Sequence, residues 1–202
     1  MIFTENVFFS AILCLIITLL CSYYFKKKNI LLDEINYSKH KKLNFNNSYK
    51  PPLCGGVIVY ISSLIFFSNG LILLKIFGLV ILTIGIFSDI NKISSPKIRI
   101  LLQILPLLLF VIFNDLRITD LRIGLFNELL DIKYVSIIFT VFCLLILLNG
   151  SNFLDGLNTL VIGYYILVSV ILILISAKFD LSLNDNIFYF LIFLIIIFLF
   201  NF

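Results

Sequence analysis

Charged side chains are scarce in this sequence. Asp, Glu, Lys and Arg make up only 13% of its 202 residues, about half of the share that is usual in soluble domains. Hydrophobic residues make up 61%, and the mean hydropathy is +1.16. This composition excludes an ordinary soluble domain and predicts an integral membrane protein.

Cysteine and histidine are also few. The four cysteines form no C-x-x-C pair and lie in or at the start of apolar runs, so we expect neither disulfides nor a zinc site. The single histidine, His40, lies in a basic loop, where a solvated side chain is the alternative to a functional one.

Long apolar runs recur along the whole chain, and each is near the roughly 20 residues that cross a bilayer. They predict an all-α, multi-pass transmembrane fold of about seven spans, within one integral membrane domain over residues 1–202. The first run follows Glu5 instead of a basic segment, and no small-x-small cleavage site comes after Phe25, so we interpret it as a membrane anchor. The seven runs cover residues 7–25, 53–69, 71–88, 98–113, 134–149, 160–177 and 187–202.

The basic residues are distributed unevenly between the loops. Seven of the fifteen Lys and Arg lie between the first two runs and three lie between the third run and the first residues of the fourth, whereas four lie in the loops of the opposite side. By the positive-inside rule, the loops 26–52, 89–97 and 150–159 are cytoplasmic and the N-terminus is outside. Topology alone explains any one of these lysines, and we expect no nucleic-acid partner.

A first group of polar residues falls on the predicted cytoplasmic side, in the loop that carries Lys39 and His40. The motif P-P-L-C-G-G follows at residues 51–56. Pro52 favours the first turn of a helix. The glycine pair at 55–56 allows close approach of a neighbouring helix or of a ligand phosphate, and helix packing alone would explain it.

A second group closes the third run and opens the fourth. Asp89 is expected where the third helix ends, and Pro96, with Ser94 or Ser95 before it as the cap, predicts the first turn of the next helix. Lys97 and Arg99 place cations at a helix N-terminus, where the macrodipole disfavours them unless an anion is near. An anionic ligand would satisfy them, although positive-inside bias explains them as well. The alternative for Asp89 is a solvated loop acid.

A third group lies in the sequence N-G-S-N-F-L-D-G-L-N-T-L at residues 149–160. A buried acid in a membrane helix costs about 2.5–3.5 kcal/mol, so polar residues beside such a helix need a reason. Asn149, Asn152 and Asp155 are spaced by three and would share a helix face. A helix cap is the structural alternative for Asp155. Amides and a carboxylate at a basic face suit a phosphate-rich ligand with Mg²⁺, which prefers oxygen ligands.

Together these motifs resemble the polyprenyl-phosphate N-acetylhexosamine-1-phosphate transferases, the membrane family of undecaprenyl-phosphate GlcNAc-1-phosphate transferase and phospho-MurNAc-pentapeptide translocase. The resemblance covers most of the chain. It rests on Asp33 followed by S-K-H at 38–40, on P-L-C-G-G at 52–56, on residues 85–103, and most specifically on N-x-x-N-x-x-D-G-L at 149–157.

The resemblance implies transfer of a sugar 1-phosphate from a UDP-N-acetylhexosamine to polyprenyl (undecaprenyl) phosphate, with release of UMP, for cell-envelope glycan synthesis. It implies Mg²⁺ as cofactor, with Mn²⁺ as an alternative. The protein would lie in the inner membrane, in contact with membrane lipid and with its site at the cytoplasmic face. It would be a monomer or a homodimer. Asp89 and Asp155 would be the catalytic acids and the candidate metal ligands. The residues implied to bind substrate are Asn149, Asn152, Asn158, Lys39, His40, Lys97 and Arg99.

The sequence departs from the family pattern in three places. Where adjacent aspartates are common, it has Ser88 and Asp89; where D-G-x-D-G is common, Asn158 and Thr159 replace the second acid and glycine. The chain also stops at Phe202, before the family's later metal motif, so we expect a truncated domain that does not catalyse transfer alone. The alternative is a non-catalytic membrane protein that binds lipid phosphate or a partner subunit. A transporter is disfavoured, because the polar residues gather at one set of helix ends.

Overall fold

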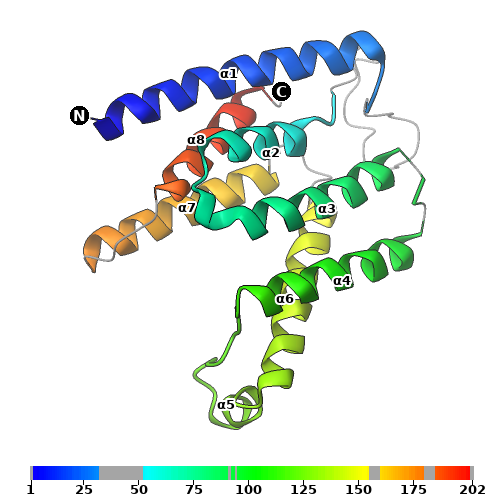
Figure 1. Cartoon of the computed structure of the whole chain (residues 1–202), viewed down its shortest axis with the longest axis vertical. Coiled ribbons are helices and arrows are strands. Elements are labelled where there is room, and N and C mark those ends of the chain that lie inside the picture. The colour runs from blue at the N-terminus through cyan, green and yellow to red at the C-terminus, as the bar shows by residue number, and fades with distance from the viewer. Residues whose placement is uncertain are drawn as a thin grey trace. The chain divides into compact units, whose positions relative to one another are not determined.

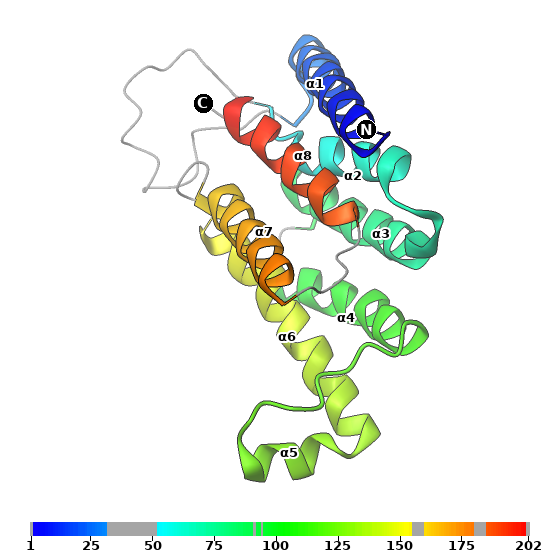
Figure 2. The same ribbon diagram turned by 90° about the vertical axis from the view of Figure 1, so that its left-hand side faces the viewer.

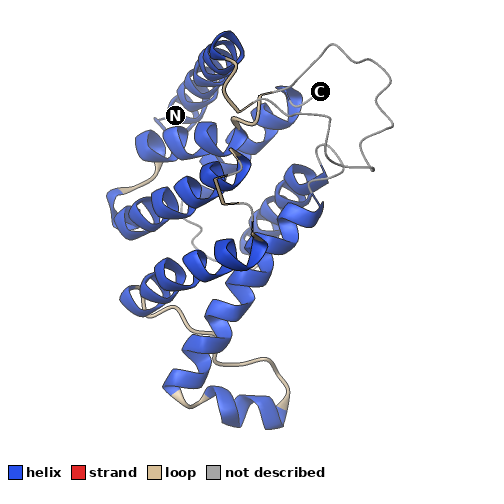
Figure 3. Ribbon diagram, turned by 90° about the vertical axis from the view of Figure 1, so that its right-hand side faces the viewer, coloured by secondary structure: helices blue, strands red, loops and turns tan. Residues whose placement is uncertain are grey.

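The computed structural model describes residues 2–31, 52–90, 92–93, 95–154, 160–179 and 185–200. The described chain contains eight α-helices, a short 3-10 helix and no strand (Figures 1 and 3). The predicted all-α fold class is therefore confirmed. The α-helices are α1 (Ile2–Lys28), α2 (Gly55–Phe66), α3 (Ile72–Asp89), α4 (Pro96–Phe113), α5 (Gly124–Leu130), α6 (Lys133–Leu154), α7 (Leu160–Lys178) and α8 (Asn186–Phe200), and the 3-10 helix η3 is Asn69–Leu71.

A helix occupies each of the seven predicted apolar ranges. Five of the described helical segments are long and apolar enough to cross a membrane, whereas α2 and α8 are shorter. Helices are expected here because lipid offers no hydrogen bonds, so the backbone must pair within each segment. The exact number of spans stays a prediction. The five segments are Val7–Lys28, Asn69–Asp89, Pro96–Phe113, Lys133–Gly150 and Leu160–Lys178.

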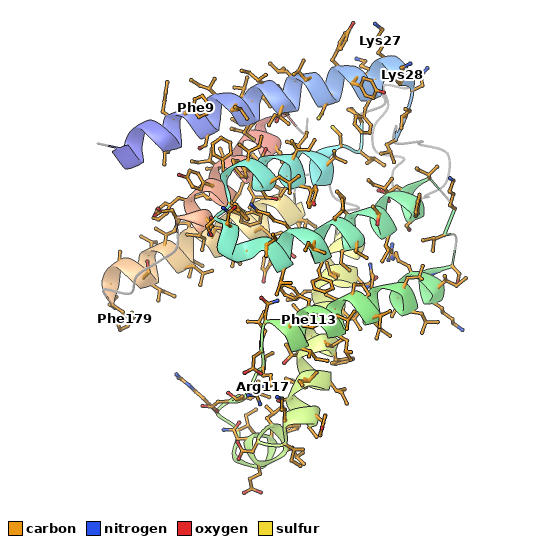
Figure 4. All side chains as sticks on the ribbon, viewed as in Figure 1. Phe9, Lys27, Lys28, Phe113, Arg117 and Phe179 are labelled. Atoms are coloured by element: carbon orange, nitrogen blue, oxygen red, sulfur yellow. The ribbon has the colours of Figure 1, made fainter. Side chains whose placement is uncertain are left out.

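Apolar side chains also cover the outside of these helices (Figure 4). Phe8, Leu20, Leu101 and Leu174 are each more than 60% exposed. A water-soluble surface rarely carries so much contiguous apolar area, whereas lipid chains cover it favourably. The exposure therefore agrees with a membrane protein.

The helices belong to two compact units. The first contains residues 1–69 and 154–202, and within it α8 packs against α1, α2 and α7 (Figure 2). Its core is built around the fully buried Phe193 of α8, with Cys14 of α1 and Ile58 of α2. The prediction of a single membrane domain remains a prediction, and each unit is described by itself.

The start of α2 differs from the prediction. Pro52 was expected in the first turn, but the helix begins at Gly55 after Cys54. Residues 52–54 precede the helix instead, and the Leu53 amide donates to the Leu31 carbonyl at 2.7 Å. A Cβ atom on Gly55 would lie 3.7 Å from Ile197, an ordinary packing distance. Gly55 thus faces α8.

The second unit, residues 70–153, contains α3, α4, α5 and nearly all of α6. Helices α3 and α4 pack side by side and antiparallel (Figure 1). Leu107 and Val111 from α4 form a buried cluster with Ile137 and Val141 from α6. This cluster joins α4 and α6, two of the helices that carry the candidate site.

Candidate functional site

One end of the second unit holds three of the polar residues that the sequence singled out, namely Asp89, Lys97 and Arg99. Asp89 is the last residue of α3, and α4 begins at Pro96 after a short connection. The connection is folded back, because the amides of Lys92 and Ile93 both donate to the Phe87 carbonyl. Because α3 and α4 pack side by side and antiparallel, Asp89 and the first turn of α4 lie at the same end of this helix pair.

The direction of α6 brings a third helix end to the same place. The amide of Ile118, in the segment after α4, donates to the hydroxyl oxygen of Thr140 in the first half of α6. Gln103, in the first half of α4, is bonded to Asn149, near the end of α6. Because late α4 meets early α6 and early α4 meets late α6, the two helices run in opposite directions. The end of α6 thus lies toward the start of α4.

The first turn of α4 carries Lys97 and Arg99 and no acid. Lys97 is exposed and Arg99 is half-buried. Ser95 is the N-cap and Pro96 the first helical residue, as predicted, but the Ser95 hydroxyl makes no capping bond. Two cations thus stand at the positive end of a helix dipole, which favours a nearby anion.

Asp89 presents the opposite case at the end of α3. Its side chain is exposed, and it places an acid at the negative end of a helix dipole, which favours a nearby cation. Lys92 belongs to the same turn, but its ammonium lies 5.5 Å from the centre of the Phe87 ring. The helix ends therefore present an acid that favours a cation and a pair of bases that favours an anion.

Asn149 is the buried polar residue of the group, with 9% of its surface exposed. Its side-chain nitrogen donates to Gln103 Oε1 at 2.9 Å and to the Leu145 carbonyl at 3.0 Å. Its Oδ1 atom is buried and has no hydrogen-bond partner in the described chain. Most buried polar atoms are paired, so this unpaired acceptor is a candidate position for a bound group or an ordered water.

The remaining predicted residues divide into two sets. Asn152 belongs to the last turn of α6, three residues after Asn149, so the predicted helical spacing of these two positions is confirmed for the backbone. Four others lie outside the described residues: Asp155, Asn158, Lys39 and His40.

One carboxylate at this end of the described chain could take part in holding a magnesium ion. Asp89 supplies an exposed carboxylate, and Mg²⁺ is commonly held by one or two carboxylates together with the phosphates of a substrate. The described residues hold no group of three or more His, Cys, Asp or Glu that could bind a metal by itself. Any metal here would therefore be shared with a ligand.

Gln103 was not predicted as a site residue. The sequence shows it only as the end of the stretch 85–103 and gives no sign of its contact with Asn149. A polar side chain inside an apolar helix was the available signal, since such residues usually face a partner or a cavity.

Comparison with protein families gives one match for this chain. Residues 71–202, more than half of the chain, match the model of Glycosyl transferase family 4. The matched region includes Asp89, Lys97, Arg99, Gln103 and Asn149. No curated protein and no solved structure matches the chain.

Proposed function

We propose a specific reaction for this chain, which belongs to glycosyl transferase family 4 and is therefore a membrane glycosyl-1-phosphate transferase. A UDP-N-acetylhexosamine donates its N-acetylhexosamine 1-phosphate to polyprenyl phosphate, and UMP is released. An oxygen of the lipid phosphate bonds to the β-phosphorus of the UDP-sugar. The bond between that phosphorus and the oxygen bridging to UMP breaks, so UMP leaves with that oxygen.

The observation that supports the proposal is that Asp89 closes α3, that Lys97 and Arg99 open α4, and that early α4 is bonded to late α6 through Gln103 and Asn149. Phosphoryl transfer requires mainly that a protein positions the phosphates and neutralises their charge. Lys97 and Arg99 at the start of α4 supply that positive charge, together with the helix dipole. A diphosphate bound between these residues would also offset the unfavourable interaction of the two cations with the helix dipole.

Asp89 either orients or deprotonates the lipid phosphate, or it holds Mg²⁺. Asp155 would be the second acid. When bound, Mg²⁺ neutralises negative charge on the transferred phosphoryl group. Asn149, Asn152 and Asn158 bind the nucleotide sugar, with Lys39 and His40 contributed from the long basic loop. The site faces the cytoplasm, and the product enters cell-envelope glycan synthesis.

The test uses membranes from cells that express the complete natural reading frame, so that any residues beyond position 202 are present. They are incubated with polyprenyl phosphate, Mg²⁺ and either UDP-N-acetylglucosamine or UDP-N-acetylgalactosamine, and the released UMP is measured. We expect UMP release only when lipid, metal and nucleotide sugar are all present. UMP release that does not depend on the lipid, or none at all, would contradict the proposal and favour a non-catalytic phosphate-binding membrane protein.

A further inference from the structure

The orientation of the Asn149 amide is fixed by its two contacts. Its side-chain nitrogen lies 3.0 Å from the Leu145 carbonyl, and a main-chain carbonyl can only accept a hydrogen bond. The atom facing Leu145 must therefore be nitrogen rather than oxygen. Gln103 Oε1, 2.9 Å away, accepts from the same nitrogen.

These two bonds use both hydrogens of the Asn149 amide. The only capacity that remains is that of Oδ1, which accepts and cannot donate. This atom is buried and has no partner in the described chain. A buried acceptor left unpaired costs about 1–3 kcal/mol, so we expect it to be paired when the site is filled.

An acceptor selects the chemistry of its partner. The oxygens of an ionised diphosphate only accept, so they cannot bond to Asn149 Oδ1. The nucleotide and sugar parts of a UDP-N-acetylhexosamine carry the required donors, which are hydroxyl groups and amide N–H groups. Asn149 is thus suited to the sugar or the nucleoside and not to the phosphates.

We propose that Gln103 is a positioning residue for the nucleotide sugar. By accepting from the Asn149 nitrogen, it holds the amide so that Oδ1 receives a hydrogen bond from a hydroxyl or amide N–H of that substrate. This inference rests on the proposed function, which supplies the nucleotide sugar. Lys97 and Arg99 remain the groups that bind its phosphates.

The pair also joins two membrane helices, and such bonds contribute to stability, by about 0.6 kcal/mol on average. A role in stability alone would lower the melting temperature without affecting substrate affinity. A positioning role of Gln103 acts through Asn149, so Gln103→Met should have no further effect on substrate affinity once the Asn149 side chain is removed. A double-mutant cycle separates the two.

The experiment measures the Kd of UDP-N-acetylglucosamine and of UDP-N-acetylgalactosamine in detergent, without turnover. It compares the wild-type protein with Gln103→Met, Asn149→Ala and the double variant. Gln103→Met keeps the length of the side chain but removes the acceptor. We expect each single change to weaken binding about tenfold, the effect of losing one buried hydrogen bond, and the double variant to bind no more weakly than Asn149→Ala.

Thr140→Val is the matched control. Thr140 also joins two segments of the second unit, because its hydroxyl oxygen accepts from the Ile118 amide at 2.9 Å, but it lies toward the other end of α6. We expect it to lower the melting temperature and leave the Kd unchanged.

UMP, which lacks the sugar, shows which part of the substrate donates the hydrogen bond. Its affinity falls with Gln103→Met if the donor is on the nucleoside and stays constant if the donor is on the sugar.

The outcomes are distinguishable from a failure of the proposed function. If the wild-type protein binds no UDP-sugar, the proposed function fails, and this inference fails with it. If the wild-type protein binds and Gln103→Met binds equally well, only the inference is overturned. Additive effects in the double variant, or a change confined to the dependence on Mg²⁺ concentration, would also overturn it.

Discussion

At the scale of single residues, the candidate site depends on charges and amides placed at helix ends. Asp89 closes α3 and Lys97 opens α4, so an acid and a base each stand where the helix dipole is unfavourable. Residues in such positions are often functional, because a bound ligand of opposite charge interacts favourably with them.

Asp89→Asn should lower turnover roughly 10²-fold or more while the protein still inserts into membranes, because it removes one charge-stabilising group from the reaction. The measurement is the initial rate of UMP release per mole of membrane-inserted protein. Asp115→Asn is the control: this acid is exposed and bonded to Arg117 in the segment after α4, and we expect near wild-type turnover. If Asp89→Asn kept wild-type turnover, Asp89 would be a solvated acid outside the chemistry.

Lys97→Gln should raise the KM for the UDP-sugar about tenfold, because it removes an exposed cation from the first turn of α4, where a phosphate would bind. The comparison is with Lys133→Gln, which removes a cation from the start of α6. That variant should keep the wild-type KM. Equal effects of the two changes would mean that general positive charge, rather than this position, attracts the nucleotide.

Sequence reasoning identified Asn149 but not the group that orients it. Asn149 stood out because an amide followed an apolar run, whereas its partner Gln103 is 46 residues away. Local spacing predicts which residues share one helix, but it does not predict the register between two helices. The unpaired Oδ1 atom, which decides the kind of ligand, became visible only in three dimensions.

At the scale of helices, the apolar runs predicted the elements well. The predicted run 160–177 and the observed α7 begin at the same residue, and helix α6 extends the run 134–149 by a few residues into the polar motif. Length and hydropathy suffice there because an apolar run of this length crosses lipid as a helix, with its backbone hydrogen bonds made within the segment. Helix α5 (Gly124–Leu130) was not predicted, because seven residues of mixed polarity give no clear period.

A contact at the start of α8 gives a stability prediction. Asn186 accepts from the Ser68 amide at 3.0 Å and donates to the Ser68 hydroxyl at 3.2 Å, so it joins α8 to the segment after α2. Asn186→Ala should destabilise the protein by about 1–3 kcal/mol, seen as a lower melting temperature in detergent. Ser176→Ala, whose hydroxyl bonds to Ile173 in its own helix, should change the melting temperature little. Equal melting temperatures for the two variants would refute the joining role.

At the scale of the whole molecule, the distribution of basic residues predicts which side of the membrane holds the site. Helix α4 is long and apolar enough to cross a membrane, so its two ends should lie on opposite sides. Figure 4 shows Arg117 in the segment that follows α4, beyond the end opposite Lys97. The excess of Lys and Arg in the loops on the Lys97 side predicts that this end of α4 lies inside.

Single cysteines at Lys97 and Thr119, in a background without the native cysteines, test this orientation. Both native side chains are exposed, so both cysteines should react with an impermeant thiol reagent once cells are permeabilised. In intact cells, we expect only the cysteine at position 119 to react. The reverse pattern would place Asp89 and Lys97 on the side that cytosolic UDP-sugars do not reach.

The most direct test of the central claim follows the β-phosphate of the donor. A UDP-N-acetylhexosamine that carries ³²P at this phosphate is incubated with the protein, Mg²⁺ and polyprenyl phosphate, and lipid and nucleotide are then separated. Transfer of a sugar 1-phosphate predicts that the label moves to the lipid while unlabelled UMP is released in equal amount. Release of labelled UDP, with a lipid that gains sugar but no label, would show transfer of the sugar alone and contradict the account.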